Sequence, residues 1–321
     1  MQDFGAGAAQ NEALVNAGFP LGFDNGLFPW QLFGDPAASN GVSNPVNDPS
    51  NDSRQLFETF PFFTPSTMMA STIGYGILRS YPSMMRDRNN PPPFIHPRCY
   101  GSEEDGWALP KSLASAVSIA SGGSREETTS KIRQEQRRVS MELFDMGIED
   151  LLSSLQALLI YTIMRIAEGP STDQDDVHLS QTLTHLCSRI PSLPNLDAQM
   201  EGFTPWKRWI IIETKRRINS VVRLMWQLYH VDVGLPHPCH RTAWSSSPLP
   251  ASKLMWKAST EEDWETAREA DAFYRELSHQ DLLFFKGCTE ADGQPSRAEW
   301  ARWYAGADEL GILVVISASL I

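Results

Sequence analysis

Tryptophan is concentrated in one stretch of this chain, from Trp206 to Trp264. The stretch holds six of the ten tryptophans of the 321-residue sequence: Trp206, Trp209, Trp226, Trp244, Trp256 and Trp264. Such large side chains need a preformed apolar environment to bury them, and the first of them recur at helical spacing. We therefore expect this stretch to be folded core, beginning with a helix over Trp206–Val231.

Three of the charged residues in that helix are spaced about one turn apart. Glu213 precedes Arg216 and Arg217 by three and four residues, so the carboxylate and the guanidinium groups are neighbours on one helix surface. Because Trp209 and Ile210 place the helix in the core, we interpret the set as a partly buried ion pair. A nuclear-localisation or phosphate-contacting patch around Lys215 is the alternative interpretation.

The first 78 residues differ in composition from the rest. They contain one basic residue, Arg54, against seven acidic ones, a net charge of −6, and no apolar period persists. Aromatic groups are interspersed with the acids, at Phe28–Phe33 and at Phe57–Phe63. Such a composition predicts disorder. It fits either a disordered tail without a binding function or an activation segment that keeps aromatic groups available for a coactivator.

Charge and cysteine spacing limit the function classes. A net charge of −12 argues against direct DNA binding by this chain alone, because phosphate contacts need surplus Lys and Arg. Cys99, Cys187, Cys239 and Cys288 are too far apart to build a zinc finger or a binuclear zinc cluster locally. Hydrolase and nucleotide-binding signatures are missing too, so we expect no enzyme, no catalytic residue, no cofactor and no metal.

Two further groups of residues carry weaker signals. His237, Cys239 and His240 gather soft ligands in a proline-flanked loop, where simple packing is the preferred interpretation over a metal site. The basic group at Lys131, Arg133, Arg137 and Arg138 fits either a localisation patch or a solvated helix face compensated by Glu135.

The rest of the pattern predicts an all-α body over residues 79–321. Asn90–Pro97 contains three successive prolines directly after Asn90 and is expected to be an extended segment docked on helices. Helices are expected over Lys131–Arg138 with Thr128 or Thr129 as the cap, Ile148–Ile163, Val177–Cys187, Trp206–Val231, from about Glu261, Arg268–Phe285, Pro295–Ala305 and Gly311–Ile321. The start of the chain lacks a signal-peptide pattern, and the run Leu151–Met164 is too short for a bilayer, so no membrane contact is expected.

Several motifs occur in an order that resembles a known family. They are Pro-Pro-Phe-Ile-His-Pro ending at Pro97, Trp-x-x-Trp-Ile-x-x-Glu-x-x-Arg-Arg ending at Arg217, and Leu-Pro-x-x-x-Leu-x-Trp-x-Ala from Leu249 to Ala258. With the apolar end of the chain, they resemble the regulatory (middle homology) domain of fungal-specific transcription factors of the binuclear zinc cluster family. The resemblance marks eight structural hallmark residues: Trp206, Trp209, Glu213, Arg216, Arg217, Leu249, Pro250 and Trp256.

The resemblance implies a nuclear, helical regulatory domain that acts on RNA polymerase II genes, often within secondary-metabolism clusters. The family's zinc cluster matches no positions here, so DNA contact is expected from a partner or a separate module. The other expected partners are a coactivator or another regulatory protein, and a second copy of the chain in a homodimer. The alternative function class is a small-molecule-sensing or protein-interaction scaffold with no direct DNA contact.

Overall fold

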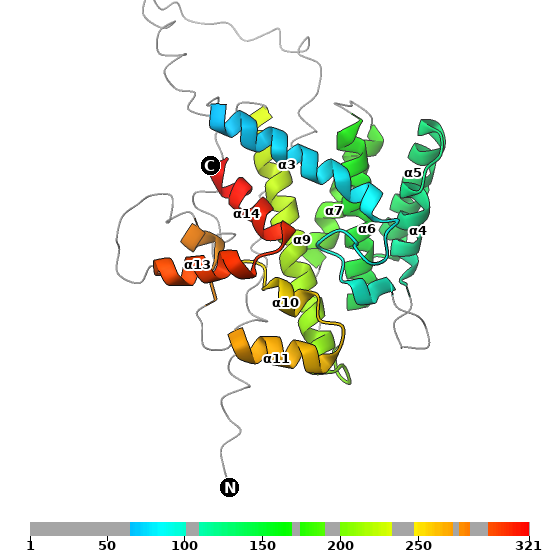
Figure 1. The fold of residues 1–321 in the computed structure, drawn as a ribbon. Coiled ribbons are helices and arrows are strands. Elements are labelled where there is room, and N and C mark those ends of the chain that lie inside the picture. The colour runs from blue at the N-terminus through cyan, green and yellow to red at the C-terminus, as the bar shows by residue number, and fades with distance from the viewer. Residues whose placement is uncertain are drawn as a thin grey trace, which may run out of the picture.

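The computed structural model describes residues 65–100, 109–168, 174–189, 200–232, 247–271, 276–282 and 295–320. Over these ranges the protein is all-α, as the sequence predicted (Figure 1). The helices are α3 (Pro65–Met84), α4 (Lys111–Ala120), α5 (Arg125–Glu142), α6 (Ile148–Ala167), α7 (Gln174–Arg189), α9 (Pro205–Asp232), α10 (Lys253–Trp256), α11 (Glu261–Asp271), α13 (Arg297–Gly306) and α14 (Glu309–Ser319), with a 3-10 turn at Pro97–Tyr100. The only β-structure within the described ranges is an isolated β-bridge between Pro248 and Ser278.

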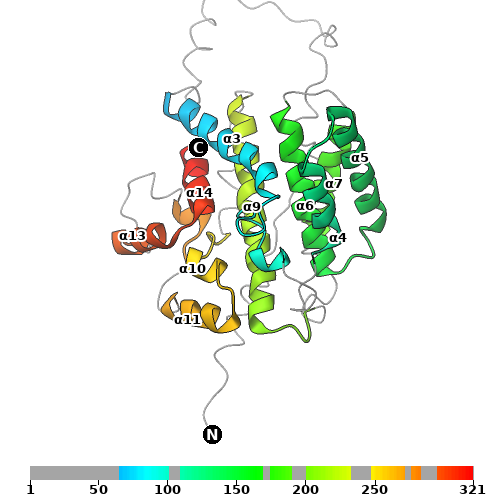
Figure 2. The ribbon, with the colours of Figure 1, turned by 45° about the vertical axis from the view of Figure 1, so that its right-hand side comes forward.

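Helix α9 is the axis of the fold. It has 28 residues, so it is about 42 Å long at a rise of about 1.5 Å per residue. Figure 2 shows α4, α5, α6 and α7 grouped on one side of α9, with α10, α11, α13 and α14 on the other. Helix α3 lies across the outside and packs on α6, α9 and α14. Residues far apart in the sequence are therefore held together through α9.

Helix α6 is the core of the α4–α7 group. All of its side chains from Leu151 to Ile163 are buried, and Glu149 and Asp150 favour its first turn by interacting with the helix dipole. The apolar run Leu151–Met164 alone is shorter than a bilayer span, but the whole helix has 20 residues and is long and apolar enough for one by length and composition. Most of its apolar window, 72%, is buried inside the protein, as in the core helix of a soluble fold.

The predicted boundary between residues 78 and 79 is wrong. It falls inside α3, which begins at Pro65, so the helical body starts earlier than expected. Ala70, Leu78 and Tyr81 form the buried side of α3, and Gly74 lets it approach Leu228 of α9 closely. Ser71 and Gly74 on the buried side, and large apolar residues on the exposed side, hide this period in the sequence. Residues 1–64 of the predicted disordered segment lie outside the described residues.

Other helix boundaries were predicted with mixed success. Helix α5 begins at Arg125, not after Thr128, because the hydroxyl of Ser124 accepts from the backbone N–H of Glu127 at 3.1 Å. A single helix over Arg268–Phe285 is wrong, since α11 ends at Asp271 and Ser278 pairs with Pro248. The apolar end of the chain forms a helix, as favoured, but α14 begins at Glu309.

Candidate functional site

The charged residues of α9 form the buried ion pair that the sequence predicted. Arg217 donates from Nε to Oε1 of Glu213 at 2.8 Å, and both side chains are almost completely buried. Arg216 lies 3.3 Å from the other oxygen of Glu213 and 2.6 Å from Glu276, which is half exposed. The pair is buried more deeply than its spacing on one helix could indicate.

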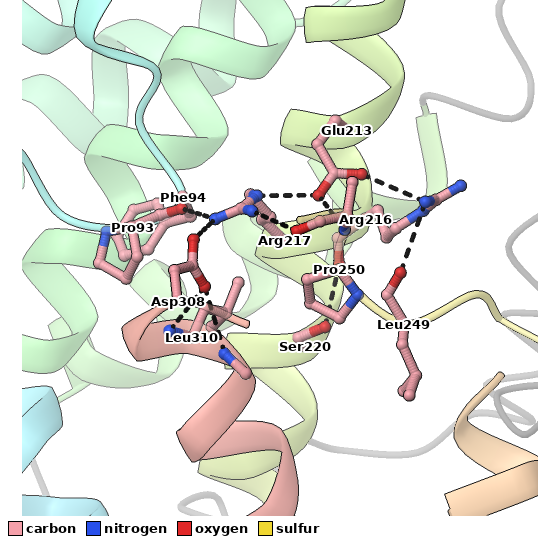
Figure 3. A network of polar contacts seen from close by, with 12 residues as sticks. Pro93, Phe94, Glu213, Arg216, Arg217, Ser220, Leu249, Pro250, Asp308 and Leu310 are labelled. Carbon is pink, nitrogen blue, oxygen red and sulfur yellow. Dashed lines mark hydrogen bonds and ion pairs between the residues drawn. The ribbon is translucent and has the colours of Figure 1, made fainter. Parts of the chain in front are cut away.

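Arg217 also contacts three segments outside α9 (Figure 3). Its Nη1 donates to the carbonyl of Pro93 at 3.0 Å and to Oδ2 of Asp308 at 2.5 Å. Its Nη2 donates to the carbonyl of Ala251 at 3.1 Å. One guanidinium group therefore joins α9 to the proline-rich segment, to the Leu-Pro segment before α10 and to the start of α14.

The carboxylates of this network have second roles. Oε1 of Glu213 also accepts from the backbone N–H of Ala251 at 2.9 Å, which fixes the Leu-Pro segment from a second direction. Asp308 is the N-cap of α14, because its Oδ1 accepts from the backbone N–H groups of Leu310 at 3.0 Å and Gly311 at 3.3 Å. The network thus holds the ends of secondary-structure elements as well as opposite charges.

Aromatic rings cover one side of the network. The guanidinium carbon of Arg217 lies 4.0 Å from the ring centroid of Trp256, a cation–π contact in a desolvated setting. His96 meets the same ring edge-on, with centroids 4.8 Å apart. The proline-rich segment that carries His96 is held by Gln156 of α6, which donates to the carbonyl of Phe94 at 2.8 Å. The predicted docking of this segment on helices is therefore confirmed.

Three other tryptophans of the stretch, Trp206, Trp209 and Trp264, lie in a second cluster at the start of α9. Trp206, Ile210, Met255, Ala258 and Trp264 are buried together, with Trp209 packed against them. The rings of Trp209 and Trp264 have centroids 5.8 Å apart, and those of Trp209 and Trp256 are 6.4 Å apart. This cluster attaches α10 and α11 to α9. Trp244 lies outside the described residues.

Of the eight predicted hallmark residues, five lie on α9, Leu249 and Pro250 lie in the segment before α10, and Trp256 is the last residue of α10. Leu249 and Pro250 contribute through their carbonyls, which accept from Nη1 of Arg216 at 3.4 Å and from Nε1 of Trp303 at 3.3 Å. Sequence reasoning missed Asp308, although an Asp directly before an apolar helical run is an N-cap signal. It also missed the participation of the Pro93 carbonyl, because backbone acceptors leave no sequence signal.

Burial changes the protonation of nearby groups. Desolvation, with the charges of Arg217 and Arg98, lowers the pKa of His96 to about 3, so this imidazole is neutral. Desolvation, with Arg223 and Arg216, lowers the pKa of His279 well below its ordinary value. Desolvation, with Asp308 and Glu309, raises the pKa of Tyr81. These groups are held in their neutral forms.

The buried charges of the network are balanced. Arg216 and Arg217 face the buried carboxylates of Glu213 and Asp308, and each guanidinium also donates to a backbone carbonyl. The third carboxylate, Glu276, is half exposed to solvent. Balanced, hydrogen-bonded charges of this kind hold segments together rather than react. Among the described residues, no group of three His, Cys, Asp or Glu side chains could hold a metal ion. His237, Cys239 and His240 lie outside the described ranges.

The basic group on α5 is largely paired. Lys131 lies 2.6 Å from Glu127, Arg133 pairs with Asp175, and Arg138 contacts both Glu135 and Glu142. Of the two interpretations, this matches the compensated helix face, and the local compensation by Glu135 is confirmed. Lys215 of α9 is largely buried, and desolvation lowers its pKa to about 8. A continuous phosphate-binding surface is not formed by these residues.

Comparison with known proteins found no family model, no curated protein and no solved structure that matches this chain. The resemblance to fungal regulatory domains therefore stays a prediction from the motifs.

Proposed function

We propose that this protein is a nuclear transcriptional regulator of RNA polymerase II genes, with a secondary-metabolism gene cluster as the expected target. The observation that supports the proposal best is the convergence of three separate motifs on one network. The carbonyl of Pro93, the Glu213–Arg217 pair and Ala251 of the Leu-Pro segment meet at a single guanidinium group. Motifs that match a family only by chance have no reason to meet in the folded protein. The contact of all three motifs with Arg217 therefore supports the resemblance.

The proposal assigns DNA contact to a partner or a separate module. The net charge of −12 disfavours a phosphate-binding surface, and most of the basic group on α5 is neutralised by acids. A gel-shift with the full chain is expected to show no specific complex with DNA. Specific binding that survives at physiological salt would contradict this assignment.

A reporter assay tests the regulatory role. Residues 1–64, which precede α3, are fused to a foreign DNA-binding domain, and so is the full chain. We expect residues 1–64 to activate the reporter, because acidic residues keep their aromatic groups accessible to a coactivator. The matched control replaces Phe28, Trp30, Phe57 and Phe60 by Ser and keeps every acid; it is expected to lose activation.

The second candidate is a protein-interaction or small-molecule-sensing scaffold with no direct transcriptional role. The large apolar side chains exposed on α3 favour the interaction form of this candidate. If neither fusion changes reporter output while the chain is present in the nucleus, the regulatory proposal fails and the scaffold remains.

A further inference from the structure

The end of α5 carries a basic motif that the network around Arg217 does not use. It reads Arg137-Arg138-Val139-Ser140-Met141, and no other Ser or Thr of the sequence has two adjacent arginines at the third and second positions before it. A protein kinase whose peptide groove is lined with carboxylates binds such a pattern, because each guanidinium pairs with a carboxylate and so positions the hydroxyl group. The motif therefore marks Ser140 as a candidate phosphate acceptor.

The key side chains of the motif lie at the surface. Arg137 and Ser140 are exposed, and Met141, directly after the hydroxyl residue, is 80% exposed. An apolar side chain of this size that faces water favours binding to a partner. By contrast, Ser220 of α9 also has an arginine three residues before it, but this is Arg217, and both residues are buried. Exposure thus distinguishes Ser140 from a serine in a similar sequence context.

The end of α5 can open without unfolding the rest of the protein. Helix α5 lies at the outer edge of the fold in both ribbon views, and of its 18 residues only Ile132 and Val139 are buried (Figures 1 and 2). Elements with few buried side chains open locally at low cost, and Ser140 lies in the last turn, where helices fray first. Arg138 is ion-paired within this same end of the helix, so opening the turn also frees the second arginine for a kinase.

The hydroxyl of Ser140 joins α5 to α7 through a single hydrogen. Thr182 of α7 donates its own hydrogen to the carbonyl of His178 at 2.8 Å. Gln136 donates to both hydroxyl oxygens, at 3.1 Å to Ser140 and at 2.8 Å to Thr182. The remaining contact, 3.1 Å between the two hydroxyl oxygens, therefore uses the hydrogen of Ser140.

We propose that Ser140 is phosphorylated by a Ser/Thr kinase with an acidic peptide groove, and that the phosphate separates the end of α5 from α7. The Oγ atom of Ser140 forms a bond to the γ-phosphorus of Mg-ATP. The bond between that phosphorus and the bridging oxygen breaks, and ADP leaves with the electron pair. The hydroxyl proton passes to the carboxylate base of the kinase. This site goes beyond the proposed function and is tested without a transcriptional readout, so either proposal can fail alone.

A phosphate on Ser140 opposes the contact with α7 in two ways. The Oγ atom of Ser140 no longer carries a hydrogen, so it faces the hydroxyl oxygen of Thr182 as a second acceptor at 3.1 Å. A charge of about −2 is also added at the C-terminal end of α5, where the helix dipole is already negative. Both effects favour the opened form of this end of the helix.

Phosphorylation of the folded full chain tests the site. The probe is the catalytic subunit of cyclic-AMP-dependent protein kinase with Mg-ATP, and tandem mass spectrometry locates the phosphate. We expect it at residue 140, with most incorporation lost in Ser140→Ala. Arg137→Gln is expected to lower the initial rate by about tenfold or more, because it removes one charged contact with the kinase. Arg88→Gln, at an exposed arginine in the turn after α3, is the matched control and is expected to keep the rate.

Three results overturn the proposal: incorporation that Ser140→Ala leaves unchanged, an Arg137→Gln rate equal to that of the unmodified chain, or phosphorylation of residue 140 only after the chain is unfolded in urea. The last result would mean that α5 does not open in the folded protein. Far-UV circular dichroism shows whether each variant is folded. Location of the phosphate in the unmodified chain needs no substitution, so it remains decisive if a variant unfolds.

Hydrogen exchange tests the effect of the phosphate on the contact with α7. Backbone amides in the last turn of α5 are expected to exchange roughly tenfold faster in the phosphorylated chain than in the unmodified one, as loss of a hydrogen bond to a newly charged group implies. Amides of α14, on the other side of α9, are the internal control and are expected to exchange at an unchanged rate. Equal exchange of α5 with and without the phosphate would overturn the proposed separation from α7.

Discussion

Arg217 of α9 and Asp308 at the start of α14 are joined at 2.5 Å between Nη1 and Oδ2, although 91 residues separate them. The same carboxylate caps α14 through its other oxygen. Capping and ion pairing are therefore linked: α14 begins where Asp308 can reach Arg217. Since Arg217 also binds the carbonyls of Pro93 and Ala251, one side chain sets the relative positions of four segments.

Replacing Arg217 is expected to destabilise the fold strongly. Arg217→Leu leaves the buried carboxylate of Asp308 without its cationic partner, and loss of one member of a buried pair costs about 3–5 kcal/mol. Urea unfolding followed by circular dichroism measures the loss. Arg137→Leu, at an exposed arginine of α5, is the matched control, with an expected change within about 0.5 kcal/mol. Equal effects of the two substitutions would rule out a special role for Arg217.

The two roles of Asp308 can be separated by substitution. Asp308→Asn keeps an oxygen that accepts from the N–H groups of Leu310 and Gly311, but it removes the charge that Arg217 faces. Asp308→Ala removes both. We expect Ala to cost about 1 kcal/mol more than Asn, the usual contribution of an N-cap. The measurement is the urea midpoint of each variant, and an Asn variant as unstable as Ala would show that the cap contributes nothing.

A double-mutant cycle tests the coupling between these residues. If Arg217 and Asp308 act as one unit, Arg217→Leu combined with Asp308→Asn costs less than the sum of the single substitutions, because the second change removes a group already left unpaired. The expected coupling is about 1–3 kcal/mol. Additive effects within error would contradict a direct interaction.

The α-helical class and the Glu213–Arg217 pair were predictable because both follow from spacing along a single helix. Residues four apart on α9 are neighbours whatever the rest of the chain does. The apolar stripe of α6 likewise predicted a buried helix, and the structure begins that helix at the expected residue, Ile148. Local periodicity is therefore enough to predict the helices and the pairs within one helix.

The long-range partners of Arg217 were not predictable in the same way. Asp308 is one of many acids in an acidic chain, and nothing local indicates that its carboxylate meets α9. The carbonyls of Pro93 and Ala251 are backbone groups that every residue has. The start of helix α3 was missed for a related reason. Gly74 on its buried side fits closely against Leu228 of α9, so a glycine stands where the apolar pattern of a helix would place a large side chain.

Gly311 provides a test of packing against helix propensity. It lies inside α14, where Ala is intrinsically more favourable than Gly by about 1 kcal/mol. However, a Cβ at this position would lie 2.6 Å from Cβ of Ala307, so the start of α14 must shift. We expect Gly311→Ala to lower the free energy of unfolding by about 1–3 kcal/mol, as overpacking does. Gln134→Ala, on the exposed side of α5, is the control; a stabilised Gly311→Ala variant would contradict the contact.

The buried histidines predict how stability depends on pH. The pKa of His96 in the folded protein is about 3, below its ordinary value of 6.5, so only the unfolded chain takes up this proton as pH falls below 6.5. The contribution of neutral His96 to the free energy of unfolding is therefore complete above pH 6.5 and is lost progressively as the pH falls toward 3. His279 acts in the same direction, because burial also lowers its pKa.

His96 contributes a slope that approaches about 1.4 kcal/mol per pH unit, and His279 adds to it in the same direction. The free energy of unfolding, measured by urea titration, should therefore fall between pH 6 and pH 5. In His96→Asn, the amide oxygen can still accept from the backbone N–H of Arg98, as Nδ1 does at 3.2 Å, but the side chain does not titrate. We expect this variant to lose about 1.4 kcal/mol per pH unit of the slope, and His96→Asn with His279→Asn to lose more. An unchanged slope in the single variant would mean that His96 is protonated in the folded protein, which its position between Arg217, Arg98 and the ring of Trp256 opposes.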